Sequence, residues 1–365
     1  RRHTPRGTAN MSDVLALARP EIVALRPYQH AAWDPQLERL HANELPWRPM
    51  PDQSIAGLNR YPEPQPAELI AALAELYQVR PEQVLVGRGS DEGIDLLTRA
   101  FCRAGVDSIL VCPPTFGMYT VAARIQSAGV VEVPLRANLG YQLDVDALER
   151  SITPAVKLIY LCSPNNPTGN GLARAAVDQV LHAAAGRALV VLDEAYAEFS
   201  GDLGRAAELA LNPHLVILRT LSKAHGLAGA RVGTVLAQPA IVQLLRKIIP
   251  PYAMSQLTIE AALRALSPAA LALTRSRVMA LQAERTRMTH RLAECPAVDK
   301  VWPSDANFLL VEFAAPEQAL AAIRAAGLIV RDFRSTPGLA AALRITIGSP
   351  EQNDKLLASL QGRKK

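Results

Sequence analysis

The sequence has few cysteines and few aromatic residues for its length, and it has no long uninterrupted apolar run. Four of its 365 residues are cysteine, and aromatic side chains make up 5%. Because the apolar runs are short, no segment reaches the length of about 18 apolar residues that a membrane-spanning helix needs. No apolar stretch follows the basic start either, so we expect no secretory signal peptide.

The cysteines show no spacing typical of a metal site or a disulfide framework. They are scattered through apolar surroundings as Cys102, Cys112, Cys162 and Cys295, without a CxxC pair. The seven histidines do not cluster with them, which argues against a metal centre. Buried free thiols in a reducing cytoplasm are the expectation, and we therefore predict a cytoplasmic protein.

The excess of positive charge lies at the two ends of the chain. Lysine and arginine outnumber acidic residues by 39 to 34. Without the six terminal basic residues, the balance is 33 basic against 34 acidic residues, so the body of the protein carries about −1. Nucleic-acid binding needs a basic face on the folded body, and we predict none. These six residues are Arg1, Arg2, Arg6, Arg363, Lys364 and Lys365.

The middle of the chain alternates short apolar runs with amphipathic helical patterns. This alternation predicts an α/β fold with a mostly parallel sheet that is covered by helices on both faces. Residues 232–236 follow the preceding strand too closely for a crossover, so we expect this strand to pair antiparallel. A smaller α+β domain is expected from the C-terminal pattern, and the N-terminal segment is predicted to join it.

Four segments follow from this division. Residues 1–10 precede Met11 and form a basic extension, native or artificial, that we expect to be disordered; a transit peptide is the alternative. Residues 11–60 form the N-terminal segment of the smaller domain. Residues 61–254 form the large domain, and residues 255–365 form a connecting helix and the rest of the smaller domain. There is no internal repeat.

One lysine among small and hydroxyl residues is the centre of the predicted site. Lys223 lies just after the apolar strand Leu215–Leu218, at the edge where open α/β sheets bind ligands. The neighbouring Thr220, Ser222 and Arg231 offer two hydroxyls and a guanidinium, which suit a phosphate. A lysine beside a phosphate site can hold a cofactor aldehyde as a Schiff base. A surface lysine in a polar loop is the simpler alternative.

Three further loops follow predicted strands and should meet the lysine loop at the same edge. Gly89–Glu92 opens a helix whose N-terminal amides can bind phosphate, although Asp91 and Glu92 also suit helix capping. Ser163–Gly169 could be a plain turn, or could hold the Asn166 amide against a phenolic oxygen. Asp193 ends a buried strand, where a carboxylate needs a cationic partner such as a protonated pyridine nitrogen, unless it is exposed.

Together these motifs resemble the pyridoxal-phosphate-dependent aminotransferases of the aspartate-aminotransferase fold. The resemblance rests on 166–169, 193–196 and 222–231. More narrowly, the sequence is similar to the histidinol-phosphate aminotransferases. That similarity covers residues 25–350 and rests on these motifs: Arg26–Tyr28, Ala42–Glu44, Asn59–Pro64, Gly87–Glu92, Pro114–Tyr119, Ile329–Asp332 and Leu343–Gly348.

The resemblance implies a role for each matching residue. Lys223 would carry the Schiff base with pyridoxal 5′-phosphate and move a proton, and Asp193 would pair with the pyridinium. Asn166 and Tyr196 would hold the 3′ oxygen, and Tyr119 would stack on the ring. The cofactor phosphate would be held by the Ser90 and Asp91 amides, Thr220, Ser222, Arg231 and, from the partner subunit of a homodimer, Tyr61. Tyr28, Arg331 and Arg344 would line the substrate pocket.

The implied reaction is the transfer of an amino group from L-histidinol phosphate to 2-oxoglutarate, in L-histidine biosynthesis. Two guanidiniums suit both the phosphate of the first substrate and the carboxylates of the second, although each could instead form a surface ion pair. An aromatic-amino-acid aminotransferase and a threonine-phosphate decarboxylase are the alternatives within the fold. A cofactor-sensing regulatory domain is the alternative outside enzymes, but the residues before Tyr28 are too few for the DNA-binding domain that such proteins carry.

Overall fold

A seven-stranded sheet forms the centre of the large domain in the computed structural model, which describes residues 14–29, 34, 36–202 and 204–361. Its strand order is β1-β7-β6-β5-β4-β2-β3. The pairs from β6 to β3 are parallel, whereas β7 pairs antiparallel with both β6 and β1, which confirms the prediction for this strand. The strands are β1 (Val84–Gly87), β2 (Ser108–Val111), β3 (Gly129–Glu132), β4 (Val156–Cys162), β5 (Leu189–Asp193), β6 (Leu215–Thr220) and β7 (Gly233–Leu236).

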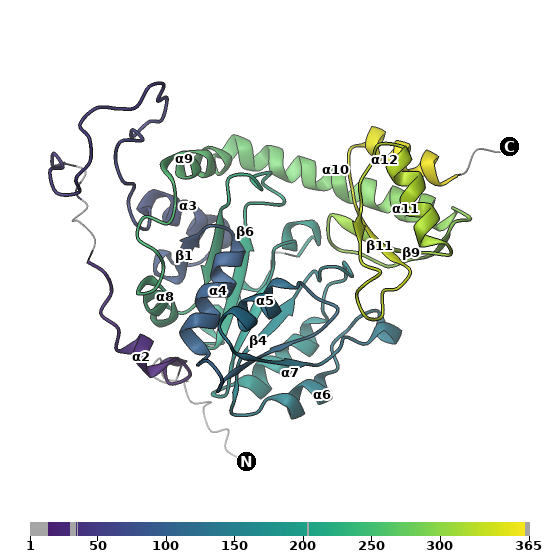
Figure 1. The fold of residues 1–365 in the computed structure, drawn as a ribbon, viewed down its shortest axis with the longest axis horizontal. Helices are drawn as coiled ribbons and strands as arrows, with labels where there is room; N and C mark the ends of the chain where they lie inside the picture. The colour runs from purple at the N-terminus through teal and green to yellow at the C-terminus, as the bar shows by residue number, and fades with distance from the viewer. Residues whose placement is uncertain (1–13, 30–33, 35, 203, 362–365) are drawn as a thin grey trace, which may run out of the picture.

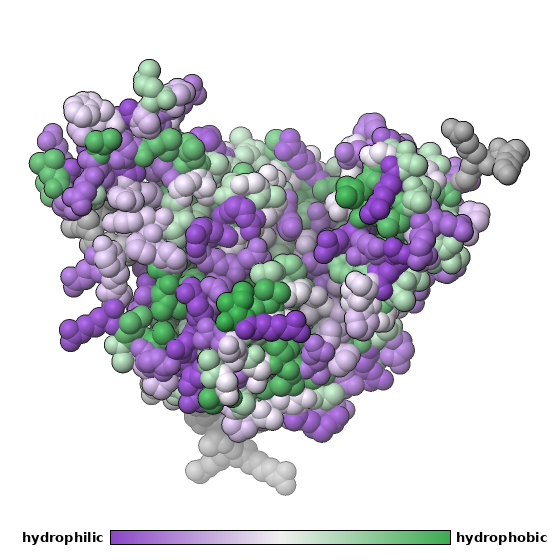
Figure 2. All heavy atoms as spheres, in the orientation of Figure 1, coloured by the Kyte–Doolittle hydropathy of each residue, from purple (hydrophilic) through white to green (hydrophobic). Residues whose placement is uncertain are grey.

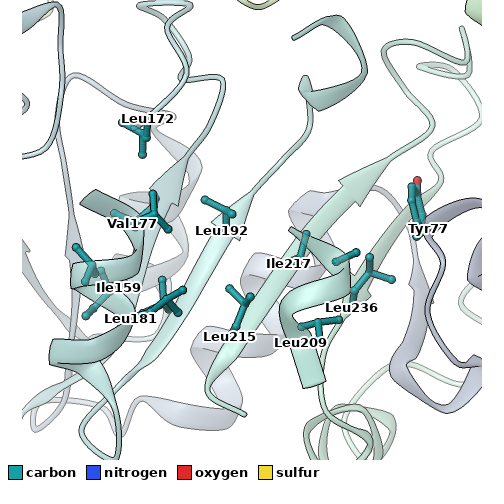
Figure 3. Close-up of a cluster of buried hydrophobic side chains, with 14 of the residues drawn as sticks. Tyr77, Ile159, Leu172, Val177, Leu181, Leu192, Leu209, Leu215, Ile217 and Leu236 are labelled. Atoms are coloured by element: carbon teal, nitrogen blue, oxygen red, sulfur yellow. The ribbon is translucent and has the colours of Figure 1, made fainter. Parts of the chain in front are cut away.

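Helices cover both faces of this sheet, as the alternating pattern predicts. One face, which we call the cavity face, packs against α4 (Ser90–Phe101), α5 (Met118–Ile125) and α8 (Pro239–Arg246). The opposite face packs against α3 (Ala67–Tyr77), α6 (Val145–Ser151), α7 (Arg174–Ala184) and α9 (Gln256–Ala265). Successive strand residues alternate between the two cores, so Leu192 and Ile217 point to the opposite face. They share a core there with Val177 and Leu181 of α7, and all four are labelled in Figure 3.

A long helix connects the large domain to a smaller one (Figure 1). The N-cap residue of helix α10 (Pro268–Ala293) is Ser267, whose hydroxyl accepts a hydrogen bond from the Ala270 amide. The smaller domain has an antiparallel sheet in the order β10-β11-β9-β8, and α10, α11 and α12 share a core with it. Its elements are β8 (Val298–Val301), β9 (Phe308–Phe313), α11 (Pro316–Ala325), β10 (Arg331–Asp332), β11 (Ala342–Thr346) and α12 (Pro350–Leu360).

The remaining elements are short. Helix α2 (Pro20–Val23) lies near the N-terminus, and four 3₁₀ turns connect longer elements of the large domain. They are η1 (Pro81–Gln83), η2 (Ala137–Leu139), η3 (Ala197–Phe199) and η4 (Ala206–Ala210). Among the described residues, no single helix has the length and apolar composition to cross a membrane; only the pair α9 and α10, bent by 70°, meets these two criteria together.

The N-terminal segment is placed differently from our prediction. Instead of joining the smaller domain, its described part contacts the large domain: Val14 and Ala18 are buried in the core of the cavity face, and the Arg19 amide donates to the Ala100 carbonyl. Residues 36–62 form an arm on the side of the molecule away from the smaller domain (Figure 1), where the Ile55 amide donates to Glu260 of α9. The predicted extension 1–10 lies outside the described residues.

Ion pairs stabilise the arm internally, and several of its apolar side chains are exposed. Buried Glu44 pairs with Arg39 and with Arg60, and accepts a hydrogen bond from the Tyr61 amide at 2.7 Å. Figure 2 shows hydrophobic side chains on the surface at the upper left, over this arm. The exposed apolar residues of the arm include Leu37, Leu40, Leu45, Trp47, Met50 and Ile55. The arm therefore exposes several large apolar side chains in one chain.

Candidate active site

A cavity of about 770 Å³ opens at the carboxyl ends of the central strands and is lined by both domains. The structure brings together there all the predicted site residues except Tyr28, Tyr61 and Tyr119. Those that line the cavity are Ser90, Asp91, Asn166, Asp193, Tyr196, Thr220, Ser222, Lys223, Arg231, Arg331 and Arg344. The meeting of four loops at one edge follows from the parallel strands, because their carboxyl ends lie on the same side of the sheet.

Asp193 is the most deeply buried acid of the cavity. Only 3% of its surface is exposed, and burial raises the pKa of its carboxyl from 3.8 to about 6. The carboxylate accepts hydrogen bonds from the Tyr119 hydroxyl at 2.7 Å and from the Ala195 amide at 3.1 Å. Both donors are neutral, so a cation that entered the cavity and reached Asp193 would find a carboxylate ready to pair with it.

Tyr119 does not line the cavity, which corrects its predicted role as the residue that stacks on the cofactor. Its ring is fully buried and stacks on Tyr160 with ring centres 4.7 Å apart, while its hydroxyl donates a hydrogen bond to Asp193. Phe116, three residues earlier, lines the cavity instead. Helix α5 begins only at Met118, so Phe116 belongs to the loop at the strand end, whereas Tyr119 is in the first turn and points into the core.

The Lys223 side chain lines the cavity, and its surroundings favour the neutral amine. Partial burial and the nearby guanidiniums of Arg344 and Arg231 lower the pKa of its ammonium, although Asp91 and Asp193 oppose this shift. Its Nζ atom lies 5.6 Å from the centre of the Tyr196 ring. A neutral amine is the nucleophilic form, so the environment suits attack on an aldehyde.

The N-terminus of α4 and the lysine loop form a cup for an anion. The N-cap residue Gly89 has φ +83° and provides no side-chain cap, which leaves the first amides of α4 directed to the cup. A Cβ atom on Gly233 would lie 2.2 Å from the Ser90 nitrogen, so only glycine lets β7 approach this helix start. Arg231 reaches Asp91 at 3.1 Å and Ser222 at 3.4 Å across the cup.

The loop after β4 orients Asn166. Asn165, which we had not singled out, fixes this loop: its amide donates to the Pro114 carbonyl at 2.9 Å and accepts from the Thr115 hydroxyl at 2.9 Å. The neighbouring Asn166 is buried, and its side-chain oxygen accepts a hydrogen bond from Arg344. The remaining polar atoms of this amide are N–H donors, which can serve an oxygen in the cavity.

Two arginines of the smaller domain face the lysine across the cavity. Arg331 of β10 and Arg344 of β11 are register partners, so their side chains lie on the same face of the sheet. Phe333 and Thr336 also line this wall and were not predicted. Phe333 follows Arg331 by two residues, and this alternation is the sequence signal that could have identified it.

The other two predicted residues lie outside the cavity. Tyr61 is half-exposed on the arm and stacks on Tyr252 with ring centres 4.6 Å apart. Tyr28 is 69% exposed on the N-terminal segment. Neither residue lines the cavity of its own chain, so the structure does not test their predicted contacts with a cofactor or substrate.

The residues of the cavity fit pyridoxal 5′-phosphate. Lys223 suits its aldehyde, the cup of Ser90, Asp91, Thr220, Ser222 and Arg231 suits its phosphate, and the buried Asp193 suits its protonated ring nitrogen. The burial of Asp193 with only neutral donors is the observation that carries this fit, because an ionised carboxylate in the core needs a cation.

Comparisons with known proteins agree with this chemistry. Residues 40–360 match the model of the family described as aminotransferase class I and II. The chain is 45% identical to the histidinol-phosphate aminotransferase of Stenotrophomonas maltophilia, over 98% of this chain and 99% of that protein. It is 50% identical to the one of Xylella fastidiosa, over 88% of each chain.

A solved structure gives the same relationship in three dimensions. The histidinol-phosphate aminotransferase of Sinorhizobium meliloti, in complex with pyridoxal-5′-phosphate, superposes with a TM-score of 0.74 and 25% identity, covering 83% of this chain and 82% of that one. The cofactor of the family is pyridoxal phosphate. The chain therefore belongs to the class I and II aminotransferases and, within them, to the family of histidinol-phosphate aminotransferases.

Proposed function

We propose that this protein transfers the amino group of L-histidinol phosphate to 2-oxoglutarate, giving imidazole acetol phosphate and L-glutamate in L-histidine biosynthesis. The observation that carries the proposal is the placement of Arg331 and Arg344 opposite Lys223 in one cavity. Both substrates are anions that this wall can bind, and both must bring a carbon atom to the lysine. The identity of 45–50% to histidinol-phosphate aminotransferases supports this choice of substrate.

Two residues have chemical roles in the proposed reaction: Lys223 transfers protons, and Asp193 pairs with the charge of the cofactor ring. When bound, pyridoxal phosphate supplies a ring that accepts the electron pair left behind as the donor loses its proton. Lys223 Nζ takes the proton from the carbon that bears the amino group and delivers one to the keto carbon of 2-oxoglutarate in the second half-reaction. Asp193 keeps the proton on the ring nitrogen, which maintains the electron demand of the ring.

The remaining residues of the cavity orient the reactants. The N–H groups of Asn166 and the hydroxyl of Tyr196 would hold the 3′ oxygen of pyridoxal phosphate, and Phe116 would contact its ring. Arg331 and Arg344 bind the phosphate of the first substrate and then a carboxylate of the second. Because one wall serves both anions in turn, a single cavity supports both halves of the reaction.

We also propose that the active unit is a homodimer in which Tyr61 of each arm reaches the cofactor phosphate in the partner's cavity. Tyr28 is proposed to line the substrate pocket. The outward apolar side chains of the arm support this assembly, since Leu40 and Met50 are each 96% exposed in one chain. We likewise propose a cytoplasmic location, which the four buried free cysteines support.

A substrate comparison tests the reaction. The purified protein is loaded with pyridoxal phosphate and mixed with L-histidinol phosphate, phenylalanine or threonine phosphate, each with 2-oxoglutarate, and products are identified by mass spectrometry. We expect imidazole acetol phosphate and glutamate, with much slower turnover of phenylalanine and no carbon dioxide from threonine phosphate. Faster reaction of phenylalanine, or release of carbon dioxide, would contradict the proposed substrate.

A mixing experiment tests the assembly. Lys223→Ala and Tyr61→Ala each impair the cavity to which they contribute. If Tyr61 acts in the partner's cavity, mixed dimers contain one cavity with both native residues, so activity returns when the two variants are unfolded and refolded together. No recovery in verified mixed dimers would place Tyr61 in its own chain's site or outside catalysis.

A further inference from the structure

Two guanidiniums of like charge are held side by side on the wall of the cavity. Arg331 and Arg344 are directly opposed across the antiparallel pair β10 and β11. Like charges in opposed positions of two strands repel each other, so the arrangement is unfavourable unless something lies between or beside them. Burial and the nearby charge of Arg331 lower the pKa of Arg344, although Tyr196 opposes this shift.

The ring of Phe333 contacts both guanidiniums. The Cζ atom of Arg344 lies 5.3 Å from the centre of this ring, and that of Arg331 lies 5.9 Å from it. Arg344 also lies 5.0 Å from the centre of the Phe308 ring, so its position has a second support. An aromatic face attracts a guanidinium electrostatically within about 6 Å, which makes Phe333 the shared neighbour of the pair.

Phe333 is itself held in place by packing and by a backbone hydrogen bond. Its side chain is half-buried against a core cluster that includes Leu339 and Ala342 of the smaller domain, and its amide donates to the Ala342 carbonyl at 3.3 Å. The ring therefore has a fixed position relative to β11, and a fixed ring fixes the two guanidiniums that lie against it. A flexible aliphatic side chain would fill space there but would offer no aromatic face to the two guanidiniums.

We propose that Phe333 is a specificity-determining residue, which positions Arg331 and Arg344 as a two-pronged clamp for a phosphate rather than a carboxylate. A phosphate presents three oxygens and about two charges, enough to engage both forks, whereas one fork satisfies the two oxygens of a carboxylate. Loss of the clamp geometry should therefore weaken phosphate binding more than carboxylate binding. The identity of the amino donor rests on the proposed function, but the clamp itself does not.

The experiment compares Phe333→Leu with two matched variants in the holoenzyme. Phe333→Tyr keeps the aromatic face, and Phe313→Leu removes a buried ring from β9 of the same sheet, in the core away from the cavity. We measure kcat and KM for L-histidinol phosphate and for 2-oxoglutarate. Inhibition by inorganic phosphate is measured as well, with any amino donor that the wild type uses.

For Phe333→Leu we expect KM for histidinol phosphate and the inhibition constant of phosphate to rise about 5- to 10-fold, as expected for loss of two cation–π contacts. KM for 2-oxoglutarate and kcat should change by less than about twofold. Phe333→Tyr should restore phosphate binding, and Phe313→Leu should leave the ratio of the two KM values unchanged. Equal weakening of both substrates, failure of the tyrosine variant, or the same ratio change in Phe313→Leu would overturn the proposal.

The phosphate measurement separates this proposal from the proposed function. If the wild type does not use histidinol phosphate, the assignment of the donor fails, while phosphate inhibition with the donor that it does use still tests the clamp. If histidinol phosphate reacts but Phe333→Leu leaves phosphate inhibition unchanged, the clamp fails and the reaction stands.

Discussion

Two adjacent carboxylates at the end of β5 lie in contrasting surroundings on the two faces of the sheet. Asp193 points to the cavity face and Glu194 to the opposite face, and both are 3% exposed. Burial raises the pKa of both, to about 6 for Asp193 and to about 7 for Glu194. Burial and a raised pKa are therefore common to both residues, and they do not tell which one serves catalysis.

The two carboxylates differ in the charge of the groups that they contact. Glu194 has an internal cation, Arg219, at 3.2 Å, and accepts a hydrogen bond from the Arg205 amide at 2.8 Å. Among the described residues, Asp193 accepts hydrogen bonds from the neutral donors Tyr119 and Ala195 and has no ion pair. A perturbed pKa indicates a functional site when the compensating charge is left for a ligand to supply, and a structural cluster when the protein supplies it. The variants below compare one face with the other.

The largest expected effects come from replacing the basic residue on each face, Lys223 and Arg219. Lys223→Ala should lower kcat/KM by about 10⁴-fold or more, because the proton carrier is lost, while the free energy of unfolding changes by less than about 0.5 kcal/mol. Arg219→Gln should instead lower the free energy of unfolding and leave kcat/KM of the folded protein nearly unchanged, because it removes the cation beside Glu194 and Glu198. We expect a loss of roughly 3 kcal/mol of stability. Urea unfolding and steady-state kinetics on both variants check this exchange.

If Lys223→Ala unfolds as readily as Arg219→Gln, or if Arg219→Gln is inactive while still folded, the separation of roles between the faces is wrong. Circular dichroism at the assay temperature establishes which fraction of each variant is folded. The comparison is then made per folded molecule.

The carboxylates themselves give the next effect. Asp193→Asn should lower kcat/KM by about 10²–10³-fold, as expected when a charge that stabilises the transition state is removed. Glu194→Gln should keep activity within about tenfold but lower stability by roughly 1–3 kcal/mol, because buried Arg219 loses an ion-pair partner. Kinetics and urea unfolding separate the outcomes. Equal losses of activity in both variants would show that the two carboxylates act as one unit.

The alternation that separates these two residues could be predicted from the sequence, and so could much of the site. Val190–Leu192 predicts a buried strand, and a strand places consecutive side chains on opposite faces. The motifs around Asn166, Asp193 and Lys223 follow strands that proved to be neighbours, so the loops meet. Local patterns sufficed where parallel strands position the residues.

Other parts depended on information that local patterns do not carry. Whether Phe116 or Tyr119 lines the cavity depends on where α5 begins, and helix ends are the least certain feature of a sequence pattern. The position of the arm depends on distant contacts such as Ile55 with Glu260. Phe333 matters through two arginines that become neighbours only when β10 pairs with β11.

A pH dependence sharpens the comparison further. Because the folded protein raises the pKa of Asp193 from 3.8 to about 6, its charged form is disfavoured in the cofactor-free protein. Relative to Asp193→Asn, the cofactor-free wild type should therefore lose stability as the pH rises from 4 through 6, by on the order of 3 kcal/mol above pH 7. Thermal unfolding of both proteins at several pH values measures this gap.

Pyridoxal phosphate should close the gap, since it supplies the missing cation. A gap that stays constant between pH 4 and 8 would mean that Asp193 is not the group that senses burial. The corresponding series with Glu194→Gln is the control, because Arg219 already accompanies that carboxylate and added cofactor should not change its behaviour.

The smallest effect is expected from two buried tyrosines, one in the core on each face of the sheet. Tyr119 donates a hydrogen bond to Asp193 and thereby lowers the pKa of that carboxyl, so Tyr119→Phe should raise it. Less of the carboxylate is then ionised near neutral pH, and cofactor binding should weaken about tenfold at pH 6 and less at pH 8. Spectroscopic titration with pyridoxal phosphate at the two pH values measures this.

Tyr77 provides the matched control on the opposite face. Its ring lies 4.9 Å from Arg219 Cζ, but its buried hydroxyl has no hydrogen-bond partner among the described residues. Figure 3 shows Tyr77 at the edge of the core. Tyr77→Phe keeps the ring and removes an unsatisfied polar atom, so stability should stay equal or rise slightly and cofactor binding should not change at either pH. A pH-dependent loss of cofactor in Tyr77→Phe as well would mean that tyrosine loss disturbs the whole sheet edge. The hydroxyl of Tyr119 would then have no specific role at Asp193.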